Sequence, residues 1–536
     1  MQSALRGARV RTCRHSTVGL GRIWLAGLAL LAPIPPSFAL SACGGGHAST
    51  RPAEAEHNAH LELSTVHRSD GASSGNSALP EGPRKPAEEP EKRDKRDPRA
   101  EFRAWLEPRI PKGGAIEAGG GEAIRVVHTI DPKDTHLSIA KAYLDITDVY
   151  LADDLAAELK KKKPRLAGTV EIPHLLSEPY KDAEHDRLGW PEDKALRGIF
   201  LVGAMAAKPW IETLDRLVAH GMNAVVLDGK DYMGPVTYPS KVPVAIETGA
   251  TKKAPIADLA RAIRFAHARG VRVIMRNSCF HDPWAAVKAP RLSIRGKWGG
   301  PYPVDWLDPA NEEAQNYIVE LTKEEIDAGA DEIQLDYVRF PVQRGLGNAV
   351  LPPPDGSREK VIVGFVRKVH EVTKARGVPL SLDIFGVTAT GTITDVHNLG
   401  QDIALLGPEV EALSPMTYPA HYDKGFMGWD APGTHPEIVG IGTRETLAKL
   451  SKVNGAKGAG GDNAKPLAVV RPWLQAFGWR APNYGPKYLL TEAAEAEKAG
   501  STGWLMWNPG CNYAEAWRGF PLVAKERKER VASTRD

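Results

Sequence analysis

Two aspartates each interrupt an apolar run of the kind that forms a buried strand. Asp336 stands in IQLDYVRFP, residues 333–341, and Asp383 stands in LSLDIFG, residues 380–386. A lone buried carboxylate costs several kcal/mol, so each residue needs a specific use or partner. Two carboxyl groups about 5 to 5.5 Å apart can cleave a glycosidic bond with retention. In that scheme we expect Arg339 to keep Asp336 ionised as the nucleophile, while Asp383, in the more apolar run, serves as acid and base.

Polar and aromatic residues also stand at the C-terminal ends of the other strand-like runs. Because the C-terminal ends of parallel strands meet at one edge, we expect these side chains to converge and bind substrate. They are Asp228, Asp231, Arg276, Arg339, Tyr418, His421, Arg471, Trp473, Trp507 and Asn508. Two alternatives stay open: Asp228 and Asp231 can form a turn, and Arg276 and Arg471 can brace the fold. The chain has 13 tryptophans, and a flat indole ring matches the apolar face of a sugar.

Eight apolar runs alternate with amphipathic helical patterns between Leu196 and Phe520. The runs are GIFLVGAM, NAVVLDGKD, VRVIMRNSCF, DEIQLDYVRFP, PLSLDIFGVT, EALSPMTYPAHY, PLAVVRPWLQAF and STGWLMWNPG. Near-continuous apolar strands, each followed by a helix, are typical of a parallel sheet closed into a (β/α)8 TIM barrel, so the predicted fold class is α/β. Strand-to-helix connections such as residues 281–309 are long, whereas helix-to-strand joints are short. Barrel enzymes build their sites on the strand-to-helix side.

Residues 1–43 are predicted to be a lipoprotein signal peptide. They combine an arginine-rich start, the apolar run IWLAGLALLA and the ending LSAC at Cys43. This ending resembles a bacterial lipobox, which implies lipidation of Cys43 and a lipid anchor in the membrane of the bacterial cell envelope, in the outer membrane or facing the periplasm. The alternative is an ordinary secretory signal, which would give a secreted protein.

Residues 44–105 are predicted to be a disordered linker because they are rich in Pro, Glu and Lys and poor in large apolar residues. Residues 124–176 resemble a lysin-motif (LysM) module with β-α-α-β order, which implies contact with glycan. The matching residues are Asp134, Thr135, Ile139, Ala140, Ile172 and Pro173, and Lys133 stands where the family has glycine.

The charge balance argues against nucleic acid as a partner. The formal charge of the whole chain is +3, and residues 1–42 hold five arginines and no other charged residue, so the remainder carries −2. A nucleic-acid-binding protein needs a basic surface instead. Beyond Cys43, only Cys279 and Cys511 remain. They can form a disulfide or stay as separate buried thiols.

Seven ordered motifs resemble one known family. They are KALRGIFLVGAM, NAVVLDGKD, IQLDYVRFP, LSLDIFG, SPMTYPAHY, VRPWLQAF and GWLMWN. Together they resemble a bacterial family of glycosyl hydrolase domains of unknown specificity, whose TIM barrel is related to the alpha-amylase-like hydrolases. The resemblance implies a nucleophile at Asp336, which ends the fourth strand, and an acid at Asp383 on the fifth. The alpha-amylase-like enzymes usually have Glu at the second position, and Gln334 replaces their arginine two residues before the nucleophile.

Three classes of function follow from these residues. The leading interpretation is a glycoside hydrolase that needs no cofactor and acts on a polysaccharide. The first alternative is a metal-dependent polysaccharide deacetylase with Asp228, Asp231, His281 and Asp282 as ligands. The second alternative is a glycan-binding surface lipoprotein without catalysis, which the presence of both Asp336 and Asp383 disfavours. We find no dinucleotide fingerprint, phosphate loop or serine elbow in the sequence.

Overall fold

The computed structural model describes residues 97–118, 123–180, 186–343, 345–456 and 468–522. The predicted signal peptide, residues 1–43 with Cys43, lies outside the described residues. So does the predicted linker up to residue 96. Among the described helices, none combines the length and the apolar character that a membrane crossing requires.

A small antiparallel sheet forms the N-terminal part of the described chain. Its strands are β1 (Gly114–Ala118), β2 (Ile124–Thr129) and β3 (Thr169–Glu171), in the order β1-β2-β3. Its helices are α1 (Pro98–Leu106), α2 (His136–Tyr143) and α3 (Ala152–Lys162). The elements from β2 to β3 therefore follow the predicted β-α-α-β order. Assignment of residues 124–176 to the LysM family stays a prediction.

The predicted linker, residues 44–105, extends too far toward the C-terminus. Residues from Pro98 onward form helix α1, which Asp97 caps by accepting a hydrogen bond from the Arg99 N–H. Phe102 and Leu106 lie four residues apart on one helix face and are buried in the core of the small unit. The charged residues around them made this segment resemble a linker.

Two residues of the LysM-like motif hold the turn before α2. The Asp134 carboxylate accepts hydrogen bonds from the Asp131 N–H at 2.7 Å and contacts His128 Nε2 at 3.0 Å. Thr135 caps α2 and forms a reciprocal capping box with Ser138. These motif positions therefore have a structural use that is independent of any glycan.

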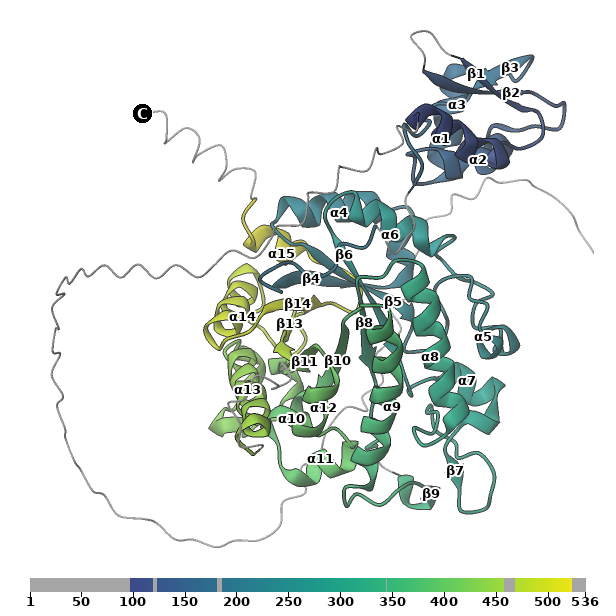
Figure 1. The fold of residues 1–536 in the computed structure, drawn as a ribbon. Helices are drawn as coiled ribbons and strands as arrows, with labels where there is room; N and C mark the ends of the chain where they lie inside the picture. Colours follow the sequence, from purple (N-terminus) through teal and green to yellow (C-terminus); the bar gives the residue numbers. More distant parts are fainter. Residues whose placement is uncertain (1–96, 119–122, 181–185, 344, 457–467, 523–536) are drawn as a thin grey trace, which may run out of the picture. The chain divides into compact units, whose positions relative to one another are not determined.

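The larger unit is built on one curled parallel sheet of nine strands (Figure 1). The sheet order is β12-β11-β10-β8-β6-β5-β4-β14-β13. The strands are β4 (Leu196–Leu201), β5 (Ala224–Lys230), β6 (Arg272–Ser278), β8 (Glu332–Asp336), β10 (Leu380–Phe385), β11 (Ala412–Met416), β12 (Val469–Val470), β13 (Trp473–Gln475) and β14 (Gly503–Trp507). Each of the eight predicted runs overlaps at least one of these strands, so the α/β class is confirmed.

The two edges of the sheet come from one stretch of chain. Only Arg471 and Pro472 separate β12 from β13, and proline interrupts a strand because it lacks an N–H donor. Val470 pairs with Leu413 of β11, and its carbonyl also accepts the Thr502 N–H at 2.8 Å. The sheet thus curls back on itself in a TIM-barrel-like manner.

Helices cover the outer side of this sheet (Figure 1). The longer ones are α4 (Trp210–Ala219), α6 (Leu259–His267), α8 (Glu312–Asp327), α9 (Ser357–Ala375), α13 (Ile438–Ala456) and α14 (Pro486–Lys498). The shorter ones are α5 (Pro243–Thr248), α7 (Pro283–Lys288), α10 (Gly386–Thr390), α11 (Ile393–Leu399), α12 (Ile403–Leu406) and α15 (Ala514–Gly519). Strands β7 (Arg295–Gly296) and β9 (Ala349–Val350) form a separate antiparallel pair.

Strand alternation divides the apolar side chains of the sheet into two cores. Val225 and Leu227 face the helices and join the large outer core, whereas Ala224 and Val226 belong to a smaller inner core. The next positions on the inner face, toward the C-terminal ends of the strands, carry the polar residues that are described below as the candidate site.

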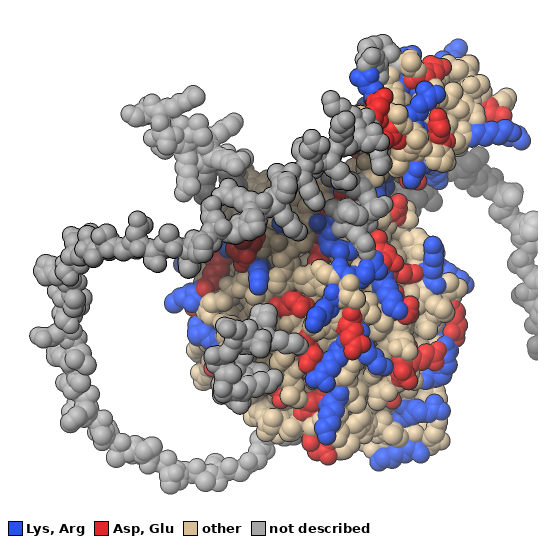
Figure 2. All heavy atoms as spheres, in the orientation of Figure 1, with Lys and Arg blue, Asp and Glu red and all other residues tan. Residues whose placement is uncertain are grey.

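On the surface, basic and acidic side chains are interspersed over the face that Figure 2 shows.

The predicted substrate contact at Arg471 is wrong, because this side chain is buried against Glu332. Its Nη1 lies 2.9 Å from Oε1 of Glu332, and both side chains are fully buried. Trp190 donates its indole N–H to the same carboxylate at 2.6 Å. Glu332 begins β8 and Asp336 ends it, a separation of about 13 Å along a strand. Arg471 therefore braces the N-terminal end of the sheet.

We predict that Arg471→Ala destabilises the protein by about 3 to 5 kcal/mol, because Glu332 would remain buried without its charged partner. Arg367 offers a matched control, since it pairs with Glu409 while its side chain is 59% exposed. Arg367→Ala should cost at most about 1 kcal/mol. Denaturant unfolding measures both free energies. Equal losses in the two variants would contradict the buried role of Arg471.

Candidate active site

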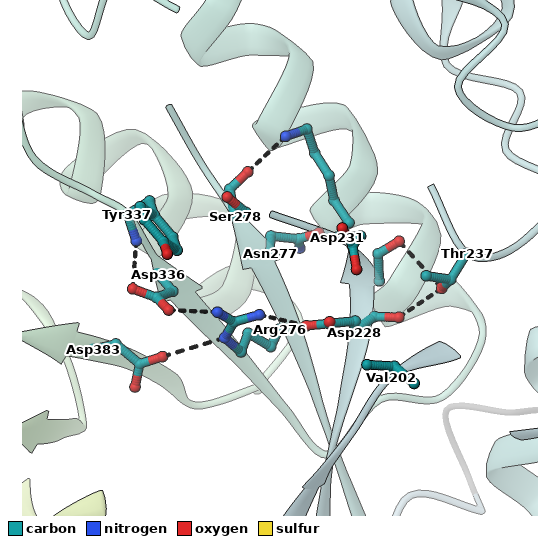
Figure 3. Close-up of polar contacts among 12 residues, drawn as sticks. Val202, Asp228, Asp231, Thr237, Arg276, Asn277, Ser278, Asp336, Tyr337 and Asp383 are labelled. Carbon is teal, nitrogen blue, oxygen red and sulfur yellow. Dashed lines mark hydrogen bonds and ion pairs between the residues drawn. The ribbon is translucent and has the colours of Figure 1, made fainter. Parts of the chain in front are cut away.

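Four charged side chains from neighbouring strands point toward one another inside the curled sheet (Figure 3). They are Asp228 on β5, Arg276 on β6, Asp336 at the end of β8 and Asp383 on β10. Asp228 lies directly beside Arg276 in the β5–β6 register, and Asp336 lies beside Ser278. Residues two apart on a strand share a face, so Asp336 emerges on the same face as Arg276.

Arg276 contacts all three carboxyl groups. Its Nη1 lies 2.5 Å from Asp228 Oδ1, its Nη2 lies 2.5 Å from Asp336 Oδ2, and its Nε lies 3.6 Å from Asp383 Oδ2. All four side chains are buried. The structure thus brings the predicted pair Asp336 and Asp383 to two sides of one planar guanidinium, whose charge offsets part of their desolvation.

Arg276, not Arg339, is the cation that contacts Asp336. Arg339 donates to the Phe340 carbonyl at 3.1 Å, and its guanidinium lies over the rings of Trp306 and Phe385, at 4.8 and 4.9 Å from their centres. The sequence neighbour of an acid was expected to be its partner. The partner instead comes from the adjacent strand, where a side chain on the same sheet face reaches it directly.

Arg276 also accounts for the departure at Gln334. In the alpha-amylase-like pattern an arginine precedes the nucleophile by two residues, and this chain has Gln334 there. Arg276 pairs with Gln334 in the β6–β8 register and therefore occupies the neighbouring position on the same face. A guanidinium therefore lies beside Asp336, and it comes from β6 and not from β8.

Burial raises the pKa of Asp383 well above its usual range, and the nearby Asp336 carboxylate raises it further. Arg276 and the Trp473 indole act in the opposite direction, because both favour the charged form. The Trp473 N–H donates to Asp383 Oδ1 at 2.6 Å, and Asp383 Oδ2 has no hydrogen-bond partner among the residues that the structure describes. The surroundings of Asp383 consequently favour its protonated form, which is the form that a general acid requires.

Asp228 is a third acid of the cluster that the sequence had placed only as a binding residue. Burial raises its pKa to about 7, partly offset by Arg276. The Thr237 hydroxyl donates to the Asp228 backbone carbonyl at 2.6 Å, which fixes the end of β5. Near neutral pH this group therefore exists in both protonation states.

The chain turns sharply directly after Asp336. Tyr337 has a φ of +50°, a left-handed conformation that residues other than glycine rarely adopt. This turn brings the Tyr337 N–H to 2.5 Å from Asp336 Oδ1. It also directs the Tyr337 ring toward His281 and Trp306, at ring-centre distances of 5.0 and 6.0 Å. Such local strain is typical of functional sites.

The remaining predicted substrate contacts divide into two groups. Tyr418 and His421 follow β11 and lie with Trp507 at the edge of the sheet that carries the acids; the Tyr418 ring is 5.0 Å from His421 and 5.5 Å from Trp507. Asn508 and Asp231 instead hold their own loops. Asn508 donates to the Ala476 carbonyl at 2.6 Å, and Asp231 accepts the Met233 N–H at 2.7 Å.

The four residues considered as metal ligands have other partners. Asp228 is bound to Arg276, and His281 Nδ1 lies 2.8 Å from the Tyr232 carbonyl. Asp282 caps α7 and pairs with Lys230 at 2.9 Å. Within the described ranges, no three His, Cys, Asp or Glu side chains gather in a way that could hold a metal ion.

A layer of buried polar groups behind the strands was missed by sequence reasoning. Lys230 donates to the Ser278 carbonyl at 2.8 Å, and Asn277 donates to Glu325 of α8 at 2.7 Å. Burial raises the pKa of Glu325 to about 8. Lys230 at the end of an apolar run could have indicated this layer, because a lysine in such a position needs a carboxylate partner when it is buried.

Cys279 and Cys511 are separate free thiols. Cys279 is buried behind the acid cluster, and burial raises its pKa. Cys511 contacts the Val202 N–H and lines a hollow of about 210 Å³ beside α4 and α15. None of the four clustered charged residues lines that hollow.

Comparison with known proteins places this geometry in a family. A family model described as "Putative glycosyl hydrolase domain" matches residues 198–513. A hypothetical protein from Ruminiclostridium thermocellum is 30% identical, with a TM-score of 0.31, covering 34% of this chain and 96% of that one. The PgaB (BpsB) glycoside hydrolase domain from Bordetella bronchiseptica is 13% identical, with a TM-score of 0.43, covering 61% and 99%.

A third similar structure is the alpha-galactosidase TtGalA from Thermus thermophilus, 12% identical with a TM-score of 0.38, covering 78% of this chain and 75% of that one. No curated protein matches the sequence. The family model spans more than half of the chain and includes every member of the acid cluster. The chain belongs to this family of glycosyl hydrolase domains.

Proposed function

We propose that the protein is a glycoside hydrolase that cleaves a polysaccharide with Asp336 and Asp383, at the C-terminal edge of a closed (β/α)8 barrel. The observation that carries this proposal is the Arg276 cluster, in which two carboxyl groups from adjacent strands contact one guanidinium. Reading β12 and β13 as one interrupted strand supports the eight-stranded count.

The two carboxyl groups divide the reaction between them. Asp383 gives its proton to the leaving oxygen, while Asp336 attacks the anomeric carbon and forms a covalent glycosyl intermediate. Asp383 then takes a proton from water as the water oxygen attacks the anomeric carbon. The bond between that carbon and Asp336 breaks, which releases the sugar. Contact of both groups with one arginine implies a short separation, so we favour retention of configuration.

Arg276 stabilises this arrangement through the reaction. It balances the negative charge of Asp336 before attack and that of Asp383 after proton transfer, so the total charge around the guanidinium is unchanged. A buried, prearranged cation needs no reorganisation as charge moves from one carboxylate to the other. The metal-dependent deacetylase is disfavoured because its proposed ligands are not brought together.

We also propose that the enzyme is anchored at the bacterial cell envelope. The lipobox-like ending supports lipidation of Cys43, and the LysM-like unit supports a second contact with glycan through residues 124–176. A lipid chain on Cys43, together with the predicted linker, would allow the catalytic domain to reach a polymer near the membrane.

Cys43→Ser is expected to abolish incorporation of labelled palmitate and to move the protein from the membrane fraction to the soluble fraction. Expression of the full chain in a bacterial host, followed by fractionation, measures both effects. Cys13→Ser is the control, because this residue lies before the predicted cleavage point. Unchanged labelling in Cys43→Ser would remove the anchor from the account.

Asp336→Asn and Asp383→Asn test the catalytic pair. We expect Asp383→Asn to lower kcat/KM by about 10²- to 10⁴-fold, the usual contribution of a general acid. Loss of the nucleophile in Asp336→Asn should lower it by about 10⁴-fold or more. Release of reducing ends from a panel of bacterial polysaccharides supplies the measurement.

Asp327→Asn is the matched control for these two variants, because the Asp327 carboxylate is 62% exposed at the end of α8 and pairs with Arg376 at 2.7 Å. It should retain wild-type activity. If the wild-type protein releases reducing ends and both site variants do so at the same rate, the assignment of Asp336 and Asp383 is wrong.

Trp473→Phe should move the alkaline limb of the activity profile to higher pH. Activity requires protonated Asp383, so it declines as pH rises through the pKa of this group. The Trp473 N–H stabilises the ionised form, so its removal raises that pKa further. Trp210→Phe is the control, since the buried Trp210 indole donates to the Ala262 carbonyl away from the acids. A limb that stays in place or moves to lower pH would contradict the role of Trp473.

A further inference from the structure

Two groups of aromatic side chains lie at the edge of the sheet that carries the acids. The first aromatic cluster consists of Tyr232, His281, Trp306 and Tyr337. Its rings are linked at centre distances of 5.0 to 6.1 Å. Tyr232 is 47% exposed, whereas Trp306 is buried, so the cluster presents at least one ring to solvent.

The second aromatic cluster consists of Tyr418, His421, Phe477, Trp479 and Trp507. Its rings are linked at centre distances of 5.0 to 6.0 Å. Trp479 is 50% exposed, whereas Tyr418 is buried. Sequence reasoning had not selected Phe477 or Trp479. Both follow β13 in the loop after Gln475.

The strand order puts the two clusters on opposite sides of the curled sheet, with Asp336 on β8 and Asp383 on β10, where the two sets of strands meet. The first cluster follows strands β5, β6 and β8, and the second follows β11, β13 and β14. In the curled sheet, β10 separates the two sets on one side and β4 separates them on the other. The first cluster begins at Tyr337, directly after Asp336. The second cluster approaches the acids through Tyr418, whose pKa is raised by burial and also by the nearby Asp383 and Asp336 carboxylates.

We propose that one glycan chain lies across both aromatic clusters, with a sugar on each side of Asp336 and Asp383, and that cleavage is therefore internal. The statement about cleavage rests on the proposed hydrolase function, whereas the statement about binding does not. Solvent-exposed indole and phenol rings offer flat faces to the C–H faces of sugars. A pocket for a chain end would need such rings on one side of the acids alone.

The charges near the clusters favour a chain without acidic groups. Arg276 is bound to three carboxyl groups, and Arg339 is covered by aromatic rings and bonded to the Phe340 carbonyl. Arg480, which lies beside Trp479, pairs with Asp423 at 3.3 Å, and Lys230 pairs with Asp282. Each of these four cations already has a partner, so an acidic sugar would meet carboxylates without a free cation to offset them.

Affinity electrophoresis of the Asp336→Asn protein in native gels tests binding apart from catalysis. The gels contain dextran, laminarin, glycogen or hydroxyethyl cellulose as neutral probes, and polygalacturonate as the acidic probe. We expect retardation by at least one neutral polymer. Adding Tyr232→Ala or Trp479→Ala should each weaken that binding by about tenfold, since each removes one stacking ring.

Trp298→Ala is the control, because Trp298 is 60% exposed and stacks on Tyr302, outside both clusters. It should leave retardation unchanged. The inference is overturned if no neutral polymer retards the protein, if a single cluster accounts for the binding, or if polygalacturonate binds more tightly. Two-sided binding to a polymer that the wild-type protein never cuts would overturn the hydrolase proposal and leave the binding inference standing.

Discussion

The contact between Arg276 and three buried carboxyl groups is the interaction on which the site depends. Three acids on the inner face of one sheet would repel one another and lose their hydration, at a cost of several kcal/mol for each unpaired charge. One guanidinium offers donors in several directions within its plane, and here it meets Asp228, Asp336 and Asp383. Without it, these strands could not carry their acids inward. The same contact gives the two proposed catalytic groups different surroundings. Asp336 is hydrogen-bonded to Arg276, whereas Asp383 forms an ion pair with it at the longer distance of 3.6 Å and accepts a hydrogen bond from a neutral indole.

Much of this architecture was predictable because buried parallel strands are near-continuous runs of apolar residues. The eight apolar runs each contain strand residues, and an aspartate within such a run is conspicuous enough to identify Asp336 and Asp383 before any coordinates. Adjacent strand ends then imply that the two acids meet. The division of the seventh run into β12 and β13 was also foreseeable from Pro472, which cannot donate to a neighbouring strand.

The errors share a physical origin, which is that a sequence does not state where a side chain points. Arg339 was paired with Asp336 because the two are close in the chain, but the left-handed turn at Tyr337 directs them to different neighbours. Arg471 was assigned to the catalytic edge because it ends an apolar run, yet its long side chain reaches back to Glu332. Helix α1 was hidden by the charged residues around Phe102 and Leu106. The second aromatic cluster was incomplete because Phe477 and Trp479 stand in a loop, where spacing carries no signal.

The most direct test of this account is the titration of the Asp383 carboxyl group. Protein labelled with ¹³C at the aspartate side-chain carboxyl, compared with the same preparation of Asp383→Asn, assigns its NMR signal and follows it with pH. An ordinary aspartate titrates near 3.9, and the account predicts that the Asp383 carboxyl group titrates well above that value. A signal that titrates near that ordinary value would show that Asp383 has no proton to give, and would contradict the division of work around Arg276.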